Sequence, residues 1–344
     1  MKIIFITRTW HGTGGMQRFS RDFARYLSEE YGDDAIVLHP SARGAVSSAV
    51  FAGRALVAGV RYGRGAQVHL GDASLIVPGV LIKRLTGARL SVTVHGLDVL
   101  YPKPWYQWMI RHFLPAADRV CAVSTATADA AARRGVLRER LVVIANGIRS
   151  GADDPVRVAH ERGPMLITVG RLIPRKGVAW FIESVLPRLL QEFPALQYHV
   201  VGGGPEAEEI RRIAVRLHLA QHLRLHGVVD DRERDALLLQ SDVFVMPNVE
   251  IAGDMEGFGI VCIEAGNLGV PVAASRLQGI TDAVREGETG KFFTPGDAAD
   301  CARVIGGLLH HPMPAEDVRR STERHFNEAE LFRTYRDTVF SVHS

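Results

Sequence analysis

Three short segments of the sequence combine residue types that could bind and act on a phosphorylated or hydroxylated ligand. They are a glycine-rich turn at residues 11–18 (HGTGGMQR), a basic loop at 170–177 (GRLIPRKG) and the run 256–265 (EGFGIVCIEA). Glycines let the backbone come close to a ligand, and the free N–H groups at the start of a helix bind anions. Arg binds two phosphate oxygens through its planar guanidinium, and Lys adds a point charge. The alternatives are a plain tight turn, a solvated basic loop and surface carboxylates.

The two carboxylates of the third segment, Glu256 and Glu264, are eight residues apart. On a helix that rises about 1.5 Å per residue they would be separated by roughly 12 Å. Carboxylate pairs that act on one glycosidic bond are about 5 to 9.5 Å apart, so the spacing does not predict such a pair. It predicts one carboxylate at a sugar and the other further along an extended nucleotide. Glu264 lies in an apolar run, so its carboxylate should have a hydroxyl or a cation as partner.

Short β-branched runs that alternate with helical patterns must position these segments. The predicted strands are residues 3–7, 35–38, 67–70, 89–94, 119–123 and 141–144 in the first half, and 165–169, 197–201, 223–225, 243–246 and 270–273 in the second. The predicted helices include 17–30, 126–133, 180–192, 206–217 and 232–240. This alternation predicts an α/β protein with two doubly wound parallel sheets, in which ligands bind at the carboxyl ends of the strands. The basic loop directly follows such a strand.

The two halves of the chain differ in their balance of basic and acidic residues. Residues 1–150 hold 20 basic and 10 acidic side chains, whereas residues 151–344 hold 21 and 28. The length of 344 residues predicts two domains at roughly 150 residues each, joined by the polar segment 149–163. The basic half suits an anionic partner: nucleic acid, an anionic membrane surface or a phosphorylated substrate. The alternative is that an Arg-rich composition, with 36 Arg and 5 Lys, spread solvated charges unevenly.

The composition is typical of a folded protein in a reducing compartment. It is 47% hydrophobic and 23% charged, which excludes a disordered or fibrous chain. The three cysteines, Cys121, Cys262 and Cys301, lie far apart in apolar surroundings and predict buried, reduced thiols. The N-terminus reads as a strand instead of a secretory signal, and no run reaches the roughly 18 apolar residues of a membrane-spanning helix. We therefore expect a cytoplasmic protein that could lie peripherally on the inner face of a membrane.

The order of the motifs along the chain resembles the retaining family 4 glycosyltransferases of the GT-B fold. The matching set is Gly14-Gly15, Val123-Ser124, Asn146-Gly147-Ile148, Gly170-Arg171-Leu172 with Lys176-Gly177, the run 201–205 (VGGGP), and Glu256 with Glu264. The resemblance implies two Rossmann-like domains that face a central cleft. It places an acceptor-binding domain at 1–150, a nucleotide-sugar donor-binding domain at 164–325, and a C-terminal helix at 326–344 that packs back toward the N-terminal domain.

The resemblance also implies roles for individual residues. Four are the catalytic candidates: Arg171 and Lys176, which match the pair that binds the donor diphosphate, Glu256 beside the donor sugar, and His95 near its anomeric carbon. The further donor-binding candidates are Gly15 over the phosphates, Glu264 at the ribose, Val228 near the base, and the amides of Gly257, Phe258 and Gly259. The acceptor-binding candidates are Gln17, Arg18 and Asp98. The sequence departs from the family at Gln17, where Glu is frequent, and at Arg149, where Asp is frequent.

The activity implied by the resemblance is transfer of a hexose, with retention, from a UDP- or GDP-linked sugar to an acceptor. The acceptor would be a saccharide or a lipid-linked glycan in cell-envelope polysaccharide or glycolipid assembly. No cofactor and no essential metal are expected, because Arg and Lys supply the positive charge. The alternatives are a sugar-nucleotide epimerase, a phosphorylase and an inactive nucleotide-sugar-binding subunit. The sequence contains no recognised nucleic-acid-binding module, so nucleic acid is not an expected partner.

One segment of the basic half bears on the acceptor. Residues 101–113 (YPKPWYQWMIRHF) interleave aromatic and cationic side chains, as segments at membrane interfaces do. The alternative is a partly buried helix that packs Trp105, Trp108 and Met109 into the core. Together with the basic first half, the segment supports an anionic or lipid-linked acceptor at the inner face of a membrane.

Overall fold

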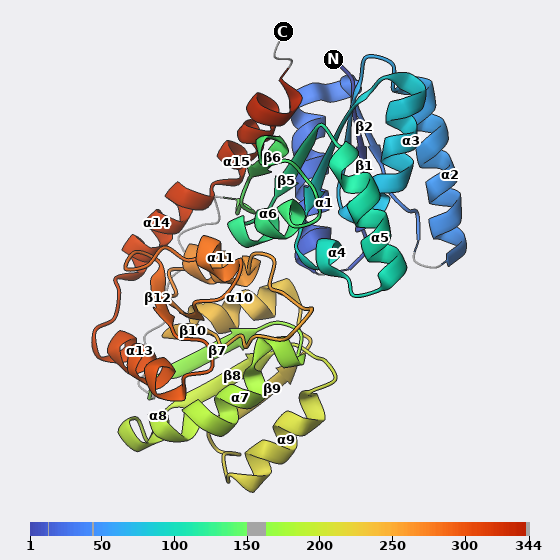
Figure 1. Ribbon diagram of the computed structural model, residues 1–344. Coiled ribbons are helices and arrows are strands. Elements are labelled where there is room, and N and C mark those ends of the chain that lie inside the picture. The colour runs from blue at the N-terminus through green and yellow to red at the C-terminus, as the bar shows by residue number, and fades with distance from the viewer. Residues whose placement is uncertain (13, 43–44, 150–162, 342–344) are drawn as a thin grey trace. The chain divides into compact units, whose positions relative to one another are not determined.

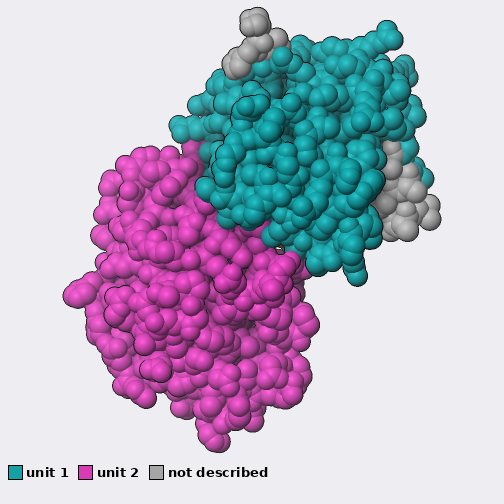
Figure 2. Space-filling model, viewed as in Figure 1, with its two compact units in different colours: residues 1–146, 328–344 teal, residues 147–327 magenta. Residues whose placement is uncertain are grey.

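The computed structural model describes residues 1–12, 14–42, 45–149 and 163–341. The chain forms two compact units (Figure 2). Unit 1 comprises residues 1–146 and 328–344, and unit 2 comprises residues 147–327. The C-terminal segment therefore belongs to the same unit as the N-terminus. Most of the expected linker 149–163 lies outside the described residues.

Unit 1 is built on a six-stranded parallel sheet with the order β2-β1-β3-β4-β5-β6 (Figure 1). The order reverses direction at β1, so the position at which such sheets bind ligands is the carboxyl ends of β1 and β3. The strands are β1 (Ile3–Ile6), β2 (Ala35–Leu38), β3 (Gln67–Leu70), β4 (Arg89–Val94), β5 (Arg119–Ala122) and β6 (Leu141–Val143). The helices are α1 (Gly15–Tyr31), α2 (Ala45–Tyr62), α3 (Ile76–Thr86), α4 (Leu97–Leu100), α5 (Pro104–Phe113), α6 (Thr125–Ala132) and α15 (Glu328–Tyr335).

The two faces of the unit 1 sheet are covered by different helices. On one face, Phe23 of α1 packs against Phe332 and Tyr335 of α15, over the strand residue Phe5. On the other face α3 contacts both α2 and α5, and the three helices lie together on one side of the sheet in Figure 1. This division follows from right-handed crossovers that run in opposite directions from β1.

The exposure of two tryptophans on α5 contradicts one of the two interpretations of residues 101–113. Tyr106 and Ile110 are the α5 side chains that enter the core. Trp105 is 64% exposed and Trp108 is 57% exposed, so the alternative in which both pack into the core is wrong. The sequence could not decide this, because the apolar side chains of α5 occupy more than one face and the neighbouring helices select the buried one.

Unit 2 has a second six-stranded parallel sheet, with the order β12-β11-β10-β7-β8-β9 (Figure 1). Its strands are β7 (Met165–Val169), β8 (Gln197–Val201), β9 (Leu223–Gly227), β10 (Val243–Met246), β11 (Val272–Ser275) and β12 (Gly290–Phe293). Its helices are α7 (Val178–Trp180), α8 (Leu186–Glu192), α9 (Ala207–Arg216), α10 (Asp231–Leu239), α11 (Ile260–Asn267), α12 (Ile280–Ala283), α13 (Ala298–His310) and α14 (Ala315–Phe326). Here the order reverses between β7 and β10, so the loops after these two strands lie next to each other.

Three expectations for unit 2 need correction. The helix expected at 180–192 is interrupted by a π-helical stretch, Phe181–Val185, because Pro187 has no N–H for a regular helical bond. The strand expected at 270–273 is β11, which begins two residues later, after Pro271. Strand β12 was not predicted, since its four residues, GKFF, include a glycine and a lysine. No helix among the described residues has the length and apolar character needed to cross a membrane.

Candidate active site

A compact ion cluster lies at the carboxyl ends of β7 and β10. Lys176, in the loop after β7, places its Nζ 2.6 Å from Oε2 of Glu256, in the loop after β10. Arg175 also donates to Oε2 of Glu256, and its Nε lies 3.1 Å from Oδ1 of Asp254. Asn248 adds a third donor to Oε2 of Glu256, at 3.1 Å. Two predicted site residues, Lys176 and Glu256, therefore come together, and Arg175, Asn248 and Asp254 join them.

The basic loop after β7 packs closely against the loop after β10, and this contact determines its backbone conformation. Residues Pro174–Lys176 form a single 3₁₀ turn that ends at Gly177, whose φ is +65°. A Cβ on Gly177 would lie 1.9 Å from the carbonyl oxygen of Pro247. Any side chain there would force the two loops apart, so glycine is required for both the turn and the contact.

Glu256 is held as a carboxylate. Its side chain is 14% exposed. Burial alone would raise its pKa, but the positive charges of Lys176 and Arg175, with the hydrogen bonds from Lys176 and Asn248, lower the pKa of Glu256 to about 2. The group is therefore ionised over the whole range in which the protein would work, and it can accept hydrogen bonds but not donate a proton.

The structure corrects the expectation that Glu256 and Glu264 share one helix. Helix α11 begins only at Ile260, after Gly259 with φ +88°, so Glu256 lies in the preceding loop and Glu264 in the helix. The predicted segment Gly257, Phe258 and Gly259 does open this helix. The Phe258 ring is buried and packs edge-on against Phe326 of α14 at 6.0 Å, which anchors the loop.

Glu264 has the cationic neighbour that its apolar surroundings required. Arg234 of α10 lies within electrostatic reach of Glu264 and forms ion pairs with Asp231 and Asp235. Burial lowers the pKa of the Arg234 guanidinium, but Glu264 and the two aspartates outweigh it, and the net shift is upward. A guanidinium is thus the charged neighbour of Glu264 on a largely apolar helix.

The other donor candidates of unit 2 are open to solvent. Arg171 is exposed, in contrast to Arg175, whose side chain is 9% exposed. Val228 follows edge strand β9 and is 81% exposed, and a Cβ on Gly203 would lie 3.2 Å from its Cγ2. Gly203 belongs to the predicted 201–205 loop, so an apolar side chain lies beside that loop.

In unit 1, His95 is held by a network at the carboxyl ends of β3 and β4. Its backbone N–H donates to Oδ1 of Asp98 at 2.7 Å, and Nε2 lies 2.9 Å from the carbonyl oxygen of Gly71. Because a carbonyl only accepts, Nε2 carries a proton, and Nδ1 can accept a hydrogen bond whenever the ring is neutral. The Phe19 ring packs edge-on against the imidazole at 5.1 Å.

Asp98, predicted as an acceptor-binding residue, has a different place. It is buried, and its second oxygen accepts the backbone N–H of Ala73 at 3.0 Å. Burial raises the pKa of Asp98, while His95 and the two amides oppose the rise. Both carboxylate oxygens are thus bound to the loops that follow β3 and β4, which fixes His95 in position. Asp72, also buried and in contact with Arg8 at 3.3 Å, was missed by the sequence analysis.

The glycine-rich turn of unit 1 leads directly into α1. Gly15 is the first residue of that helix, and Gln17 and Arg18 follow in its first turn. A Cβ on Gly14 would lie 2.5 Å from Oε1 of Gln17, so the Gln17 side chain covers the turn. Arg21 of α1 donates to the carbonyl oxygens of Trp10 and Gly12, at 3.1 and 2.9 Å, which fixes the turn to the helix.

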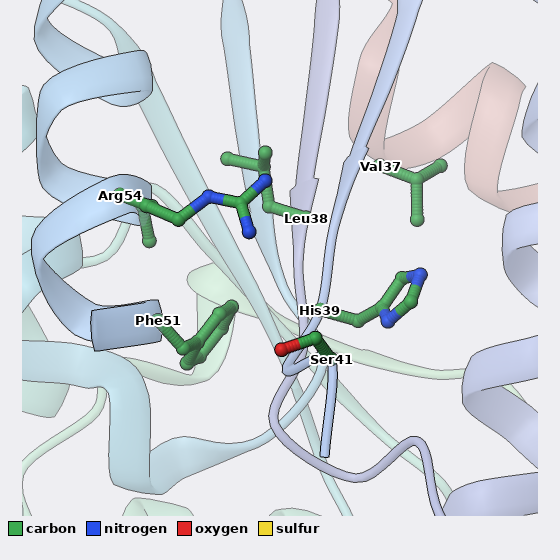
Figure 3. A pocket seen from close by; sticks show the side chains of 7 residues that line it. Val37, Leu38, His39, Ser41, Phe51 and Arg54 are labelled. Atoms are coloured by element: carbon green, nitrogen blue, oxygen red, sulfur yellow. The ribbon is translucent and has the colours of Figure 1, made fainter. Parts of the chain in front are cut away.

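A pocket of about 240 Å³ lies near this turn, at the carboxyl end of β2. Figure 3 shows Phe51 and Arg54 of α2 on one side, with Leu38, His39 and Ser41 around the opening. Trp10 stacks on His39 at 3.9 Å with nearly parallel rings. The sequence analysis did not single out these residues, because no motif connects Trp10, His39 and Arg54 along the chain.

Two family models match the chain. Residues 13–150 match the family model described as Glycosyltransferase Family 4, and residues 163–311 match the one described as Glycosyl transferases group 1. A GDP-mannose-dependent alpha-(1-6)-phosphatidylinositol monomannoside mannosyltransferase of Mycolicibacterium smegmatis is 32% identical over 255 residues, 71% of this chain and 66% of that protein. The putative colanic acid biosynthesis glycosyltransferase WcaL of Escherichia coli is 26% identical over 266 residues, 74% of this chain and 64% of that protein.

Solved structures share the fold at lower identity. HepE from Anabaena in complex with UDP superposes with a TM-score of 0.79 at 20% identity, covering 99% of this chain and all of that one. Sucrose-phosphate synthase from Thermosynechococcus elongatus gives 0.76 at 20% identity, covering 98% of this chain and 99% of that one. The two parallel sheets are those of GT-B glycosyltransferases, and the matched region spans about two thirds of the curated relatives' length. From its motifs, its two sheets and these matches, the chain belongs to glycosyltransferase family 4 and has the GT-B fold.

Proposed function

We propose that the chain is a retaining hexosyltransferase that uses a nucleotide-diphosphate sugar as donor and a saccharide or lipid-linked glycan as acceptor. The observation that carries the proposal is the ion cluster of Lys176, Arg175 and the ionised Glu256. A diphosphate needs fixed positive charge, and sugar hydroxyls need an ionised carboxylate that accepts their protons in hydrogen bonds. Unit 2 supplies both at the carboxyl ends of β7 and β10, where sheets of this kind bind ligands.

The charges of the cluster favour an incoming dianion. Arg175 is committed to Asp254 and Glu256, whereas Lys176 contacts Glu256 alone among the ion pairs recorded in the described residues. With the exposed Arg171, the loop after β7 carries three cations, and the loop after β10 carries the carboxylates of Asp254 and Glu256. In our proposal Lys176 and Arg171 bind the diphosphate, and Arg175 keeps Glu256 ionised and in place beside the sugar.

We assign the remaining donor contacts to groups of unit 2 and to Gly15. Glycines let the backbone of the loop before α11 come close to a ligand, so we assign the amides of Gly257, Phe258 and Gly259 to the sugar hydroxyls. Glu264, one to two turns along the helix, would accept the ribose hydroxyls. Val228, exposed beside the 201–205 loop, would pack against the base. Gly15 would bring its amide to the phosphates from unit 1.

The reaction we propose needs no protein base. The bond between the anomeric carbon and the diphosphate oxygen breaks, and a bond to the acceptor oxygen forms on the same face of the sugar. The acceptor's proton passes to the departing diphosphate. Lys176, Arg171 and the Gly15 amide stabilise the negative charge that grows on this diphosphate, which is electrostatic preorganisation. His95, with Nε2–H fixed on Gly71, offers Nδ1 as an acceptor for a sugar hydroxyl. We propose that no metal ion is required.

The choice of substrates to test follows from the comparisons and from unit 1. One relative is named for GDP-mannose, and a structural neighbour was solved with UDP-glucose. The pocket at the end of β2 combines the Arg54 guanidinium with the Trp10–His39 stack, a combination that suits a sugar or phosphate of the acceptor. We propose a cytoplasmic setting, which the three buried, unpaired cysteines support.

A thermal-shift panel of UDP-, GDP- and ADP-sugars tests the donor proposal. A ligand at a hundred times its Kd adds about 2.7 kcal/mol, which for a unit of this size raises Tm by roughly 5 to 10 °C. We expect one nucleotide class to do so with the wild-type chain and with Lys291→Ala, an exposed lysine on β12. Lys176→Ala should lose the shift. The absence of any shift with all three classes would refute the donor proposal.

A further inference from the structure

The solvent-facing surface of α2, α3 and α5 has a composition that is unusual for the exterior of a folded unit. Among the side chains whose burial the structure describes, the large apolar ones exposed on these helices are Val50, Val57 and Val60 of α2, Val77, Leu81 and Leu85 of α3, and Trp105 and Trp108 of α5. Each helix covers the sheet with one face, so its outer stripe should be polar. We call this set of eight side chains, with the exposed cations between them, the α2–α3–α5 face.

The spacing within each helix shows that these side chains form stripes. Val77, Leu81 and Leu85 follow one another at intervals of four along α3 and therefore lie on one side of it. Trp105 and Trp108 lie three residues apart on α5. The helices are packed together, because α3 contacts both α2 and α5. A Cβ on Gly59 of α2 would lie 2.4 Å from Cδ1 of Ile82 in α3, which shows how closely two of them approach.

Cations accompany the apolar stripes. Arg61 of α2, Arg84 of α3 and Arg111 of α5 are exposed, as is Lys103 just before α5. Near α5, burial and the positive charges of Arg111 and Arg133 lower the pKa of the Arg134 guanidinium. Arg111, Arg133 and Arg134 thus concentrate positive charge beside α5.

Carboxylates are missing from this part of the sequence. Between residues 35 and 117 the chain has only Asp72 and Asp98, and both are buried. The next carboxylate, Asp118, is bound to Lys83 at 2.6 Å. The outer faces of other helices are different: α9 exposes Glu208, Glu209 and three arginines, and α1 carries Asp22 and Glu29 among its arginines.

We propose that the α2–α3–α5 face docks on an anionic lipid bilayer. Tryptophan side chains favour the boundary between headgroups and acyl chains, and arginines bind the anionic headgroups. Apolar area and positive charge together supply the two contributions that reversible anchoring requires. The face is spread over three helices, which fits a surface better than a peptide groove. This inference deepens the acceptor part of the proposed function, because it brings unit 1 to a lipid-linked acceptor.

Vesicle sedimentation with the full chain, in the absence of nucleotide, tests the proposal. We expect binding to phosphatidylcholine vesicles that contain phosphatidylglycerol, little binding to phosphatidylcholine alone, and loss of binding at about 1 M salt, where charges are screened beyond about 3 Å. Trp105→Ser with Trp108→Ser should weaken binding at least about tenfold. Arg84→Glu with Arg111→Glu should weaken it about fivefold for each cation removed. Val215→Ser, which removes an isolated exposed valine of α9, is the matched control and should bind as wild type.

Several results would overturn the proposal. They are failure of the wild-type chain to sediment with anionic vesicles at low salt, equal binding to neutral vesicles, and unchanged binding of the tryptophan variant. Vesicle-free self-association that the same variant abolishes would assign the face to a second copy of the chain instead. The nucleotide-sugar thermal shift, measured on every variant, should equal that of wild type. It separates failure of this inference from failure of the donor proposal and confirms that each variant is folded.

Discussion

Arg175 is the residue on which the ion cluster of unit 2 depends most. Its guanidinium bridges Asp254 and Glu256, and its side chain is 9% exposed. Removing one partner of a buried ion pair costs about 3 to 5 kcal/mol, because the remaining charge is left without compensation. Here Lys176 still pairs with Glu256, and Asp254 is 29% exposed. We therefore expect Arg175→Met to lower the free energy of unfolding by about 3 kcal/mol, the lower end of that range.

A second substitution separates the effect of the positive charge of Arg175 from that of its guanidinium geometry. Arg175→Lys keeps the positive charge, but one ammonium group cannot reproduce the planar fork that reaches two carboxylates. It should lose one charge-assisted hydrogen bond, worth about 1.5 to 3 kcal/mol. Adding Asp254→Asn to Arg175→Met should cost less than the sum of the two single substitutions, because the two side chains interact directly.

Urea denaturation combined with peptide-resolved hydrogen exchange is the suitable assay. Hydrogen exchange reports the stability of unit 2 separately from that of unit 1, whereas a single denaturation curve combines the two units. Arg175→Met should raise exchange in the peptides that contain β7 and β10 and leave the α1 peptides unchanged. If Arg175→Met were within about 0.5 kcal/mol of wild type, the value typical of a surface substitution, the reasoning about a buried, bridging arginine would be refuted.

Three further predictions concern the site and the core. Lys176→Ala should reduce turnover by orders of magnitude while the protein stays folded, and near-normal transfer by the folded variant would remove its catalytic assignment. Gly177→Ala should destabilise unit 2 by more than about 1 kcal/mol in urea denaturation, because its Cβ would meet the Pro247 carbonyl; a neutral effect would contradict this. Burial, with the nearby charge of His95, lowers the pKa of His69 to about 3. The imidazole therefore takes up a proton on unfolding at any pH between about 3 and 6.5. In that range the free energy of unfolding falls by about 1.4 kcal/mol for each pH unit below about 6.5. His69→Gln should remove this contribution from the slope, and an unchanged slope would exclude His69 as its source.

The positions of the main site residues could be predicted because parallel sheets collect loops at one edge. Lys176 and Glu256 are 80 residues apart in the sequence, yet they follow strands β7 and β10, which are neighbours at the reversal of strand order. The motifs placed Lys176 in a loop directly after a strand and Glu256 just before a pair of glycines that opens a helix. The topology of the sheet then brought the two together, at 2.6 Å.

Other features depend on tertiary detail that no local pattern contains. Arg171 and Arg175 lie in one basic loop, and only the 3₁₀ turn at Pro174–Lys176 decides that Arg175 is the buried one. The burial of Asp98 likewise comes from amides on two different loops. The exposure of Trp105 and Trp108 is decided by neighbouring helices, which bury Tyr106 and Ile110 instead.

The most direct test of the proposed function is analysis of the product. The nucleotide sugar that gives the largest thermal shift is incubated with saccharide and glycolipid acceptors, release of the nucleoside diphosphate is followed, and the anomeric configuration of the product is read by proton NMR. We predict release that depends on the acceptor, one nucleotide for each sugar transferred, a product with the donor's anomeric configuration, and loss of all three in Lys176→Ala. An inverted product, or transfer that Lys176→Ala retains, would contradict the account.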